Sequence, residues 1–149
     1  MLLPGFKEVV DYLTHCEKVF VSSNLKVEQA SHAFYSPPSI VALDFERKEI
    51  VIIDIVSAWD LTQLCTRVSQ REARWCTPIK ATLISQQTVT RSWAVRVLAL
   101  VPEQTLPEAR RRFTGLEDVA CWALEQIDPA DASSLPRTYR SEPTLTVGQ

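Results

Sequence analysis

The side chains best suited to chemistry lie on and just after one strongly apolar segment. Asp54 interrupts the β-branched run Ile50-Val51-Ile52-Ile53-Asp54-Ile55-Val56. Its carboxyl group is the one ionisable side chain in that run. The segment 58–76 follows, and its polar positions could contact phosphate groups. A solvated helix face is the alternative. The positions are Arg67, Gln70, Arg71 and Arg74, with Arg91, Arg110, Arg111 and Arg112 nearby in the sequence.

Hydrophobic periodicity predicts the elements that must position these side chains. In chain order they are a helix over 5–18, a short strand or helix end over 19–21, strands over 39–45 and 50–56, a helix over 58–76, a strand over 92–101, a helix between Thr105 and Gly115, and a strand over 119–124. Segment 22–36 is ambiguous. Strand 50–56 is apolar on both faces and should be central. The order predicts an α/β fold, with a central mixed β-sheet flanked by helices on both faces.

The chain length predicts one domain over 1–127 and an extended C-terminal tail over 128–149. The tail has three prolines and few large apolar side chains, so it should gain order only on a neighbouring chain. A tail without a role is the alternative. Tyr139, Arg137 and Arg140 could anchor it, because tyrosine and arginine are favoured at interfaces.

Composition and charge exclude several classes of protein. No apolar run reaches the ~18 residues that span a membrane, and no signal-like N-terminus is present, so we expect neither secretion nor a membrane location. The net charge of −2 excludes a polycationic packaging protein. Residues 1–60 carry five Lys/Arg against nine Asp/Glu, and residues 61–149 carry eleven against nine. Nucleic-acid binding would therefore need a local basic patch.

The nucleophilic and metal-binding residue types show no diagnostic spacing. The four cysteines form no Cys-x-x-Cys pair and lie among apolar residues, so we expect reduced, buried side chains. The two histidines suggest no Ser-His-Asp arrangement, and neither a GxGxxG motif nor a P-loop is present.

One stretch resembles a known family. Tyr35-Ser36-Pro37-Pro38-Ser39-Ile40-Val41-Ala42-Leu43-Asp44, a polar turn, Ile50 through Ser57 and a helix resemble the core of PD-(D/E)xK nucleases. The resemblance covers roughly residues 5–101 and implies a restriction-endonuclease-like αβββαβ core. In that family a Pro-Asp pair opens one strand and Asp/Glu-x-Lys lies on the next. Two carboxylates hold Mg²⁺ at the scissile phosphate, and the lysine orients the attacking water.

The family motif is degenerate in this chain. Aligned from Pro38, the family's aspartate falls on Ser39, its second acid on Asp54 and its lysine on Val56. Ile55 takes the position whose backbone carbonyl would contact the metal. The resemblance therefore leaves one of the three catalytic groups in place.

A second carboxylate for a metal cannot come from the same hairpin. With a two-residue loop at Arg47-Lys48, Asp54 should lie opposite Val41, and Ser39 on the same face two residues along. Asp44 should point to the other face, near the turn, too far from Asp54 to share one ion.

Other residues could rearrange the site or balance its charge. Glu28 could supply a carboxylate, and Gln63 or Arg67 could replace the lysine from the next helix. An arginine can stabilise charge but cannot act as a base. Arg96 lies in mid-strand and should pair with a carboxylate such as Asp54, or mark an edge strand or an interface.

These observations favour a nuclease-like α/β domain that has lost catalysis. It would serve as a binding or assembly module in a DNA-handling or viral, phage-type complex. We expect no cofactor, protein subunits as partners, self-association or contact with DNA, and a cytoplasmic or virion-associated location. DNA contact would fall to Arg67, Arg71 and Arg74.

Two further hypotheses stay open. The first is an Mg²⁺-dependent DNA endonuclease with a rearranged PD-(D/E)xK site. It would use Asp54 and the Ile55 carbonyl as metal ligands and Arg67 for charge stabilisation. The second is a small structural protein whose likeness to the family is coincidental.

Overall fold

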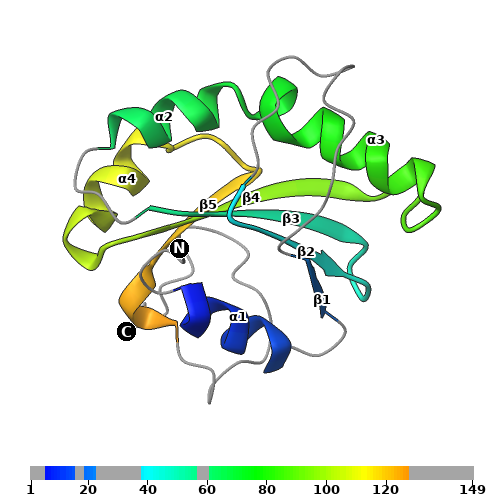
Figure 1. The fold of residues 1–149 in the computed structure, drawn as a ribbon. Coiled ribbons are helices and arrows are strands. Elements are labelled where there is room, and N and C mark those ends of the chain that lie inside the picture. The colour runs from blue at the N-terminus through cyan, green and yellow to red at the C-terminus, as the bar shows by residue number, and fades with distance from the viewer. Residues whose placement is uncertain (1–5, 16–18, 23–37, 57–60, 128–149) are drawn as a thin grey trace, which may run out of the picture.

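A computed structural model describes residues 6–15, 19–22, 38–56 and 61–127. It has helices on both faces of one mixed sheet (Figure 1). The elements are α1 (Phe6–His15), β1 (Val19–Ser22), β2 (Ile40–Asp44), β3 (Glu49–Ile55), α2 (Thr62–Ser69), the π-helical turn η2 (Glu72–Cys76), α3 (Thr77–Ser85), β4 (Ala94–Val101), the 3₁₀ turn η3 (Glu103–Thr105), α4 (Leu106–Arg112), β5 (Val119–Ala123) and the 3₁₀ turn η4 (Leu124–Gln126).

The five strands lie in the sheet in chain order. β1, β2 and β3 are antiparallel neighbours, whereas β4 is parallel to β3 and β5 is parallel to β4. A parallel neighbour requires a crossover connection. Helices α2 and α3 form the first crossover, and α4 forms the second. The predicted mixed sheet flanked by helices is confirmed, as is the central position of β3.

The two faces of the sheet have separate apolar cores. Helix α1 covers one face, and α2, α3 and α4 cover the other (Figure 1). Alternate residues of β3 serve the two cores: Ile53 packs with α1, and Ile52 packs with the other helices. Because both faces are covered, all seven residues of β3 are buried.

The predicted helix over 58–76 is longer and less regular than its periodicity indicates. Within the described residues it begins at Thr62, passes through η2 and continues to Ser85. A π-helical turn inserts an extra residue, so the helix faces before and after it are not aligned. The segment 19–21, predicted as a strand or a helix end, lies in strand β1, and the predicted helix over 5–18 is present as α1 in its described part. The predicted tail over 128–149 lies outside the described residues.

The predicted register of the β2–β3 hairpin is wrong by two residues. Val41 lies opposite Ile52 rather than Asp54, because the turn contains four residues instead of two. The Asp44 carboxylate accepts the backbone N–H groups of Glu46 and Arg47, both at 3.1 Å, and so widens the turn. Asp44 nevertheless lies near the turn, on the α1 face, as predicted.

Candidate functional site

The Asp54 carboxylate lies near the end of β3, on the face covered by α2. Asp54 alternates with Ile52, which belongs to the core under α2, and the residue is only 6% exposed. Arg67 reaches it from α2 and donates from Nε to Asp54 Oδ2 at 2.8 Å. The neighbouring Val68 is buried against the sheet, and this anchors the helix so that Arg67 can meet the carboxylate.

Burial and nearby cations act on Asp54 in opposite directions. Burial raises the pKa of the Asp54 carboxyl above its usual value, while the charges of Arg67 and Arg74 and the Arg67 hydrogen bond oppose that rise. Two guanidinium groups thus act on one carboxylate. When Asp54 is ionised, Arg67, Arg74 and Asp54 together carry one net positive charge, which suits an anionic ligand better than a cation.

Ser39 lies beside Asp54, closer than predicted. Continuing the observed register by one residue from Ile40 and Ile53 places Ser39 opposite Asp54. Its Oγ accepts the backbone N–H of Ile55 at 3.0 Å. The hydroxyl therefore fixes the strand pairing at this end of the hairpin.

The remaining motif positions are part of the core. Val56 is buried on the α2 side, and its N–H donates to the Leu100 carbonyl at 2.9 Å. It offers no side-chain donor to orient water. The Ile55 side chain packs in the core on the α1 side. Both positions stabilise the fold.

These residues do not fit an Mg²⁺ ion. Mg²⁺ takes hard oxygen ligands in octahedral geometry and usually needs carboxylates that are free to bind it. Here Asp54 Oδ2 accepts from Arg67, and Asp44 lies on the opposite face of the sheet. Among the described residues, no group of three or more His, Cys, Asp or Glu could hold a metal ion. Glu28 lies outside them.

The three arginines predicted to contact nucleic acid have different partners. Arg71 donates to both carboxylate oxygens of Asp118, the residue before β5, at 2.6 and 2.9 Å. Arg74 donates to Gln70 Oε1 at 2.8 Å. Arg67 and Arg74, which both act on Asp54, therefore form the basic side of the site. Gln63, the other predicted replacement for the lysine, is exposed.

Arg96 pairs with a carboxylate, as predicted, but its partner is Glu49 and not the suggested Asp54. Arg96 donates from Nε to Glu49 Oε1 at 3.0 Å, and both residues are buried. In the observed parallel register Arg96 lies beside Val51, which packs on the α1 face, whereas Asp54 points toward α2. Glu49 was missed because the sequence suggested a polar turn there. The pairing of Glu49 with Arg96 becomes evident only once β3 and β4 are aligned in parallel.

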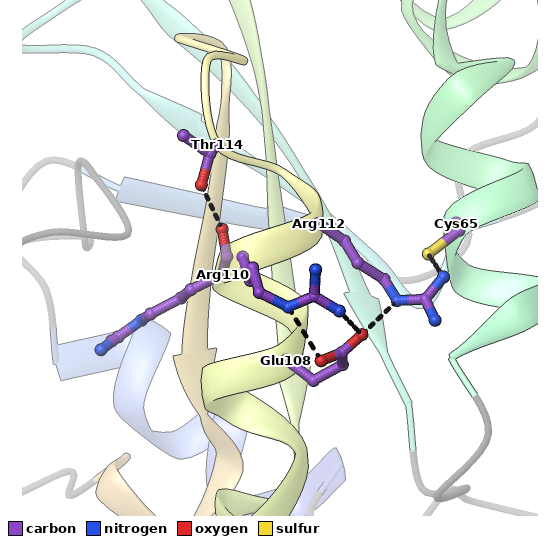
Figure 2. Close-up of polar contacts among 6 residues, drawn as sticks. Cys65, Glu108, Arg110, Arg112 and Thr114 are labelled. Atoms are coloured by element: carbon purple, nitrogen blue, oxygen red, sulfur yellow. Dashed lines mark hydrogen bonds and ion pairs between the residues drawn. The ribbon is translucent and has the colours of Figure 1, made fainter.

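A second polar cluster lies on α4 (Figure 2). Its arginines are among those that the sequence suggested could contact phosphates, but their contacts with Glu108 and Cys65 were not predicted. Glu108 accepts from Arg111 and Arg112, and Arg112 donates to the Cys65 Sγ of α2 at 3.8 Å. A cleft of about 300 Å³ opens here between α2 and the end of α4. Its lining comprises Cys65, Val68, Ser69, Arg112, Phe113 and Leu116.

The described cysteines are free thiols, as expected. Cys76 and Cys121 are buried, and burial raises the pKa of each thiol to about 12, so neither forms a thiolate readily. Cys65 is partly exposed and departs from the expected burial. Cys16 lies outside the described residues.

Comparisons of the chain with family models, with curated proteins and with solved structures find no match. In the described part of the chain, no helix is long and apolar enough to cross a membrane.

Proposed function

We propose that this protein is a non-catalytic, nuclease-like binding and assembly module of a DNA-handling or virus-type multi-subunit complex. Its arginine-neutralised Asp54 site would contact phosphate groups without cleaving them. The observation that carries the proposal is the ion pair between Arg67 Nε and Asp54 Oδ2. It puts a cation where an active site of this type would need its metal.

The arrangement of elements supports the nuclease-like part of the proposal. From α1 to β4 the chain runs helix, three strands, a helical segment and a strand. This order is the one that the PD-(D/E)xK resemblance implies. Ser39 directly precedes β2, and β2 is a hydrogen-bonded neighbour of the strand that carries Asp54, as the two acidic positions of that motif would require.

The chemistry of the site supports binding over catalysis. Hydrolysis of a phosphodiester by this motif needs metal-bound oxygen ligands and a lysine near the attacking water. Ser39 stands in place of the motif's first acid, and Val56 in place of its lysine. The remaining acid, Asp54, accepts a hydrogen bond from Arg67 on one of its oxygens. A guanidinium has five N–H donors, so Arg67 can donate to a phosphate with groups that Asp54 does not use.

Binding of a labelled DNA duplex, followed by fluorescence anisotropy at low salt, tests the contact. The double variant Arg67→Ala/Arg74→Ala should weaken binding about tenfold and flatten its salt dependence, because two phosphate contacts are lost. Arg111→Ala on α4 removes an exposed charge outside the site and serves as the matched control. Equal losses in both proteins would contradict the proposal.

A plasmid assay tests the absence of catalysis. Supercoiled DNA incubated with the protein and Mg²⁺ or Mn²⁺ should stay intact. Cleavage that disappears in Asp54→Ala would overturn the proposal and support the metal-dependent endonuclease instead. Circular dichroism of each variant must first show that it is folded.

A further inference from the structure

The turn before β3, at the other end of that strand from Asp54, carries an exposed aromatic side chain. Phe45 is 45% exposed, and it is the large hydrophobic side chain that stays exposed among the described residues. Its ring meets Trp93 edge to face, with ring centroids 5.3 Å apart and planes at 85°. Trp93 is buried, so Phe45 is supported from below. A supported aromatic ring loses little entropy on binding a partner.

Hydrogen bonds fix the turn that presents Phe45. The Asp44 carboxylate accepts two backbone N–H groups of the turn and pairs with the Arg47 guanidinium at 3.6 Å. Lys48 ends the turn in the left-handed region, with φ of 57°. Its carbonyl accepts the N–H of Ala94 at 3.1 Å, which ties the turn to the start of β4.

The loop before β4 is fixed from α3. Lys80 Nζ donates to the carbonyl oxygens of Arg91 and Trp93, at 2.9 and 2.6 Å. The Phe45–Trp93 contact joins the two loops into one surface. We call its exposed residues Phe45, Arg47, Lys48 and Arg91 the Phe45 platform.

The Phe45 platform is basic. Lys48 and Arg91 are exposed and have no ion-pair partner among the described residues, and Arg47 is paired with a nearly buried carboxylate. Glu46 is the exposed acid of the turn. Among the exposed residues of these two loops cations therefore outnumber anions, although the whole chain carries a net charge of −2.

We propose that the Phe45 platform docks an acidic segment of a partner protein whose apolar side chain packs on Phe45. An aromatic ring with arginine neighbours is typical of the energetic centre of a protein interface. Charge complementarity selects carboxylates for the surrounding contacts. Single-stranded nucleic acid fits less well, because its binding uses several aromatic rings in succession and a long basic groove.

This surface is separate from the proposed DNA contact. β3 runs from Glu49 to Ile55, so about 20 Å of strand lies between the two ends. The inference goes beyond the proposed function, and either can fail without the other.

Peptide display on the intact chain tests the partner chemistry. Random peptides selected on the wild type should converge on sequences with several Asp or Glu around one apolar residue. Neutral or basic consensus sequences, or no enrichment, would overturn the proposal.

Anisotropy with the labelled consensus peptide then maps the surface. Phe45→Ala and the charge reversal Arg91→Glu should each weaken binding at least tenfold. Phe45→Tyr, which keeps the ring, and Arg111→Glu on α4 should bind like the wild type. A labelled oligothymidylate serves as the nucleic-acid probe. Tighter binding of that probe, with the same dependence on Phe45, would contradict a protein partner.

Discussion

Two arginines one turn apart on the same helical segment pair with carboxylates in different ways. Arg67 makes a single hydrogen bond to Asp54, whose side chain is 9% exposed. Arg71 makes two hydrogen bonds to Asp118, whose side chain is 34% exposed. The pKa of Asp54 is raised by burial, whereas the pKa of Asp118 is lowered by its hydrogen bonds to Arg71. The Arg67–Asp54 pair is therefore a buried charged site, whereas the Arg71–Asp118 pair is a structural ion pair at the surface.

The difference shows that pairing alone does not set the state of a carboxylate. The cost of desolvation must be weighed against the number of donors, and at Asp54 one donor is too few to offset burial. Asp118 keeps water on one side and gains a second donor. We therefore assign Arg71 a role in holding the helix to β5, and Arg67 a role in the candidate site.

The largest expected loss of stability follows from breaking the buried Arg67–Asp54 pair. Arg67→Leu leaves Asp54 without its hydrogen-bonded cation and should lower the free energy of unfolding at neutral pH by about 3 kcal/mol. Urea unfolding followed by circular dichroism measures it. Arg67→Leu/Asp54→Leu should recover most of the loss, since neither charge is then stranded. A double variant as unstable as the single one would mean that the loss comes from packing.

A smaller loss of stability is expected when the Arg71–Asp118 ion pair at the surface is broken. Arg71→Leu removes two hydrogen bonds, but Asp118 can be resolvated, so the loss should be about 1 kcal/mol after allowance for solvent screening. The same urea titrations measure it. A loss greater than that of Arg67→Leu would reverse the assignment of the two pairs.

The two carboxylates should also give pH dependences of opposite sign. The raised pKa of Asp54 means that its contribution to stability is full below the unfolded value of 3.8 and is lost as pH rises through the folded pKa. The lowered pKa of Asp118 means that its contribution is present above 3.8 and is lost as pH falls through the folded pKa.

Unfolding of the wild type, Asp54→Asn and Asp118→Asn between pH 3 and pH 6 measures these slopes. Relative to the wild type, Asp54→Asn should become more stable as pH rises, and Asp118→Asn less stable. Slopes of the same sign would show that burial does not dominate at Asp54.

The smallest change in stability is expected for a substitution in the polar cluster on α4. Glu108 accepts from Arg111 and Arg112 at the surface, and these contacts lower the pKa of its carboxyl (Figure 2). Exposed ion pairs contribute little because water and salt screen them. Glu108→Gln should leave the melting temperature unchanged in calorimetry. A clear drop would indicate that the α4 cluster supports the cleft beside Cys65.

Much of the fold could be predicted from local pattern, but pairing details could not. The β-branched run around Asp54 predicts a buried central strand, and β3 is one. The hairpin register depended on the Asp44 side chain, which widens the turn, and no periodicity reports that. The partner of Arg96 depended on the parallel alignment of β3 with β4, which involves residues about 45 positions apart.

The candidate site could be predicted only where it depends on local spacing. Helical spacing placed Arg67 within reach of the strand that precedes it, and it meets Asp54. The pairing of Arg71 with Asp118 could not be predicted, because it depends on where β5 joins the sheet.

One measurement tests the central claim that Asp54 acts as an internal anion that neutralises an arginine site. Asp54→Asn removes the negative charge beside Arg67 and Arg74 while keeping the shape of the side chain. Binding of a labelled DNA duplex without metal should then tighten about fivefold, or ~1 kcal/mol for one charge at partly screened distance. Unchanged or weaker binding, or Mg²⁺-dependent cleavage by the wild type that the variant loses, would contradict the account.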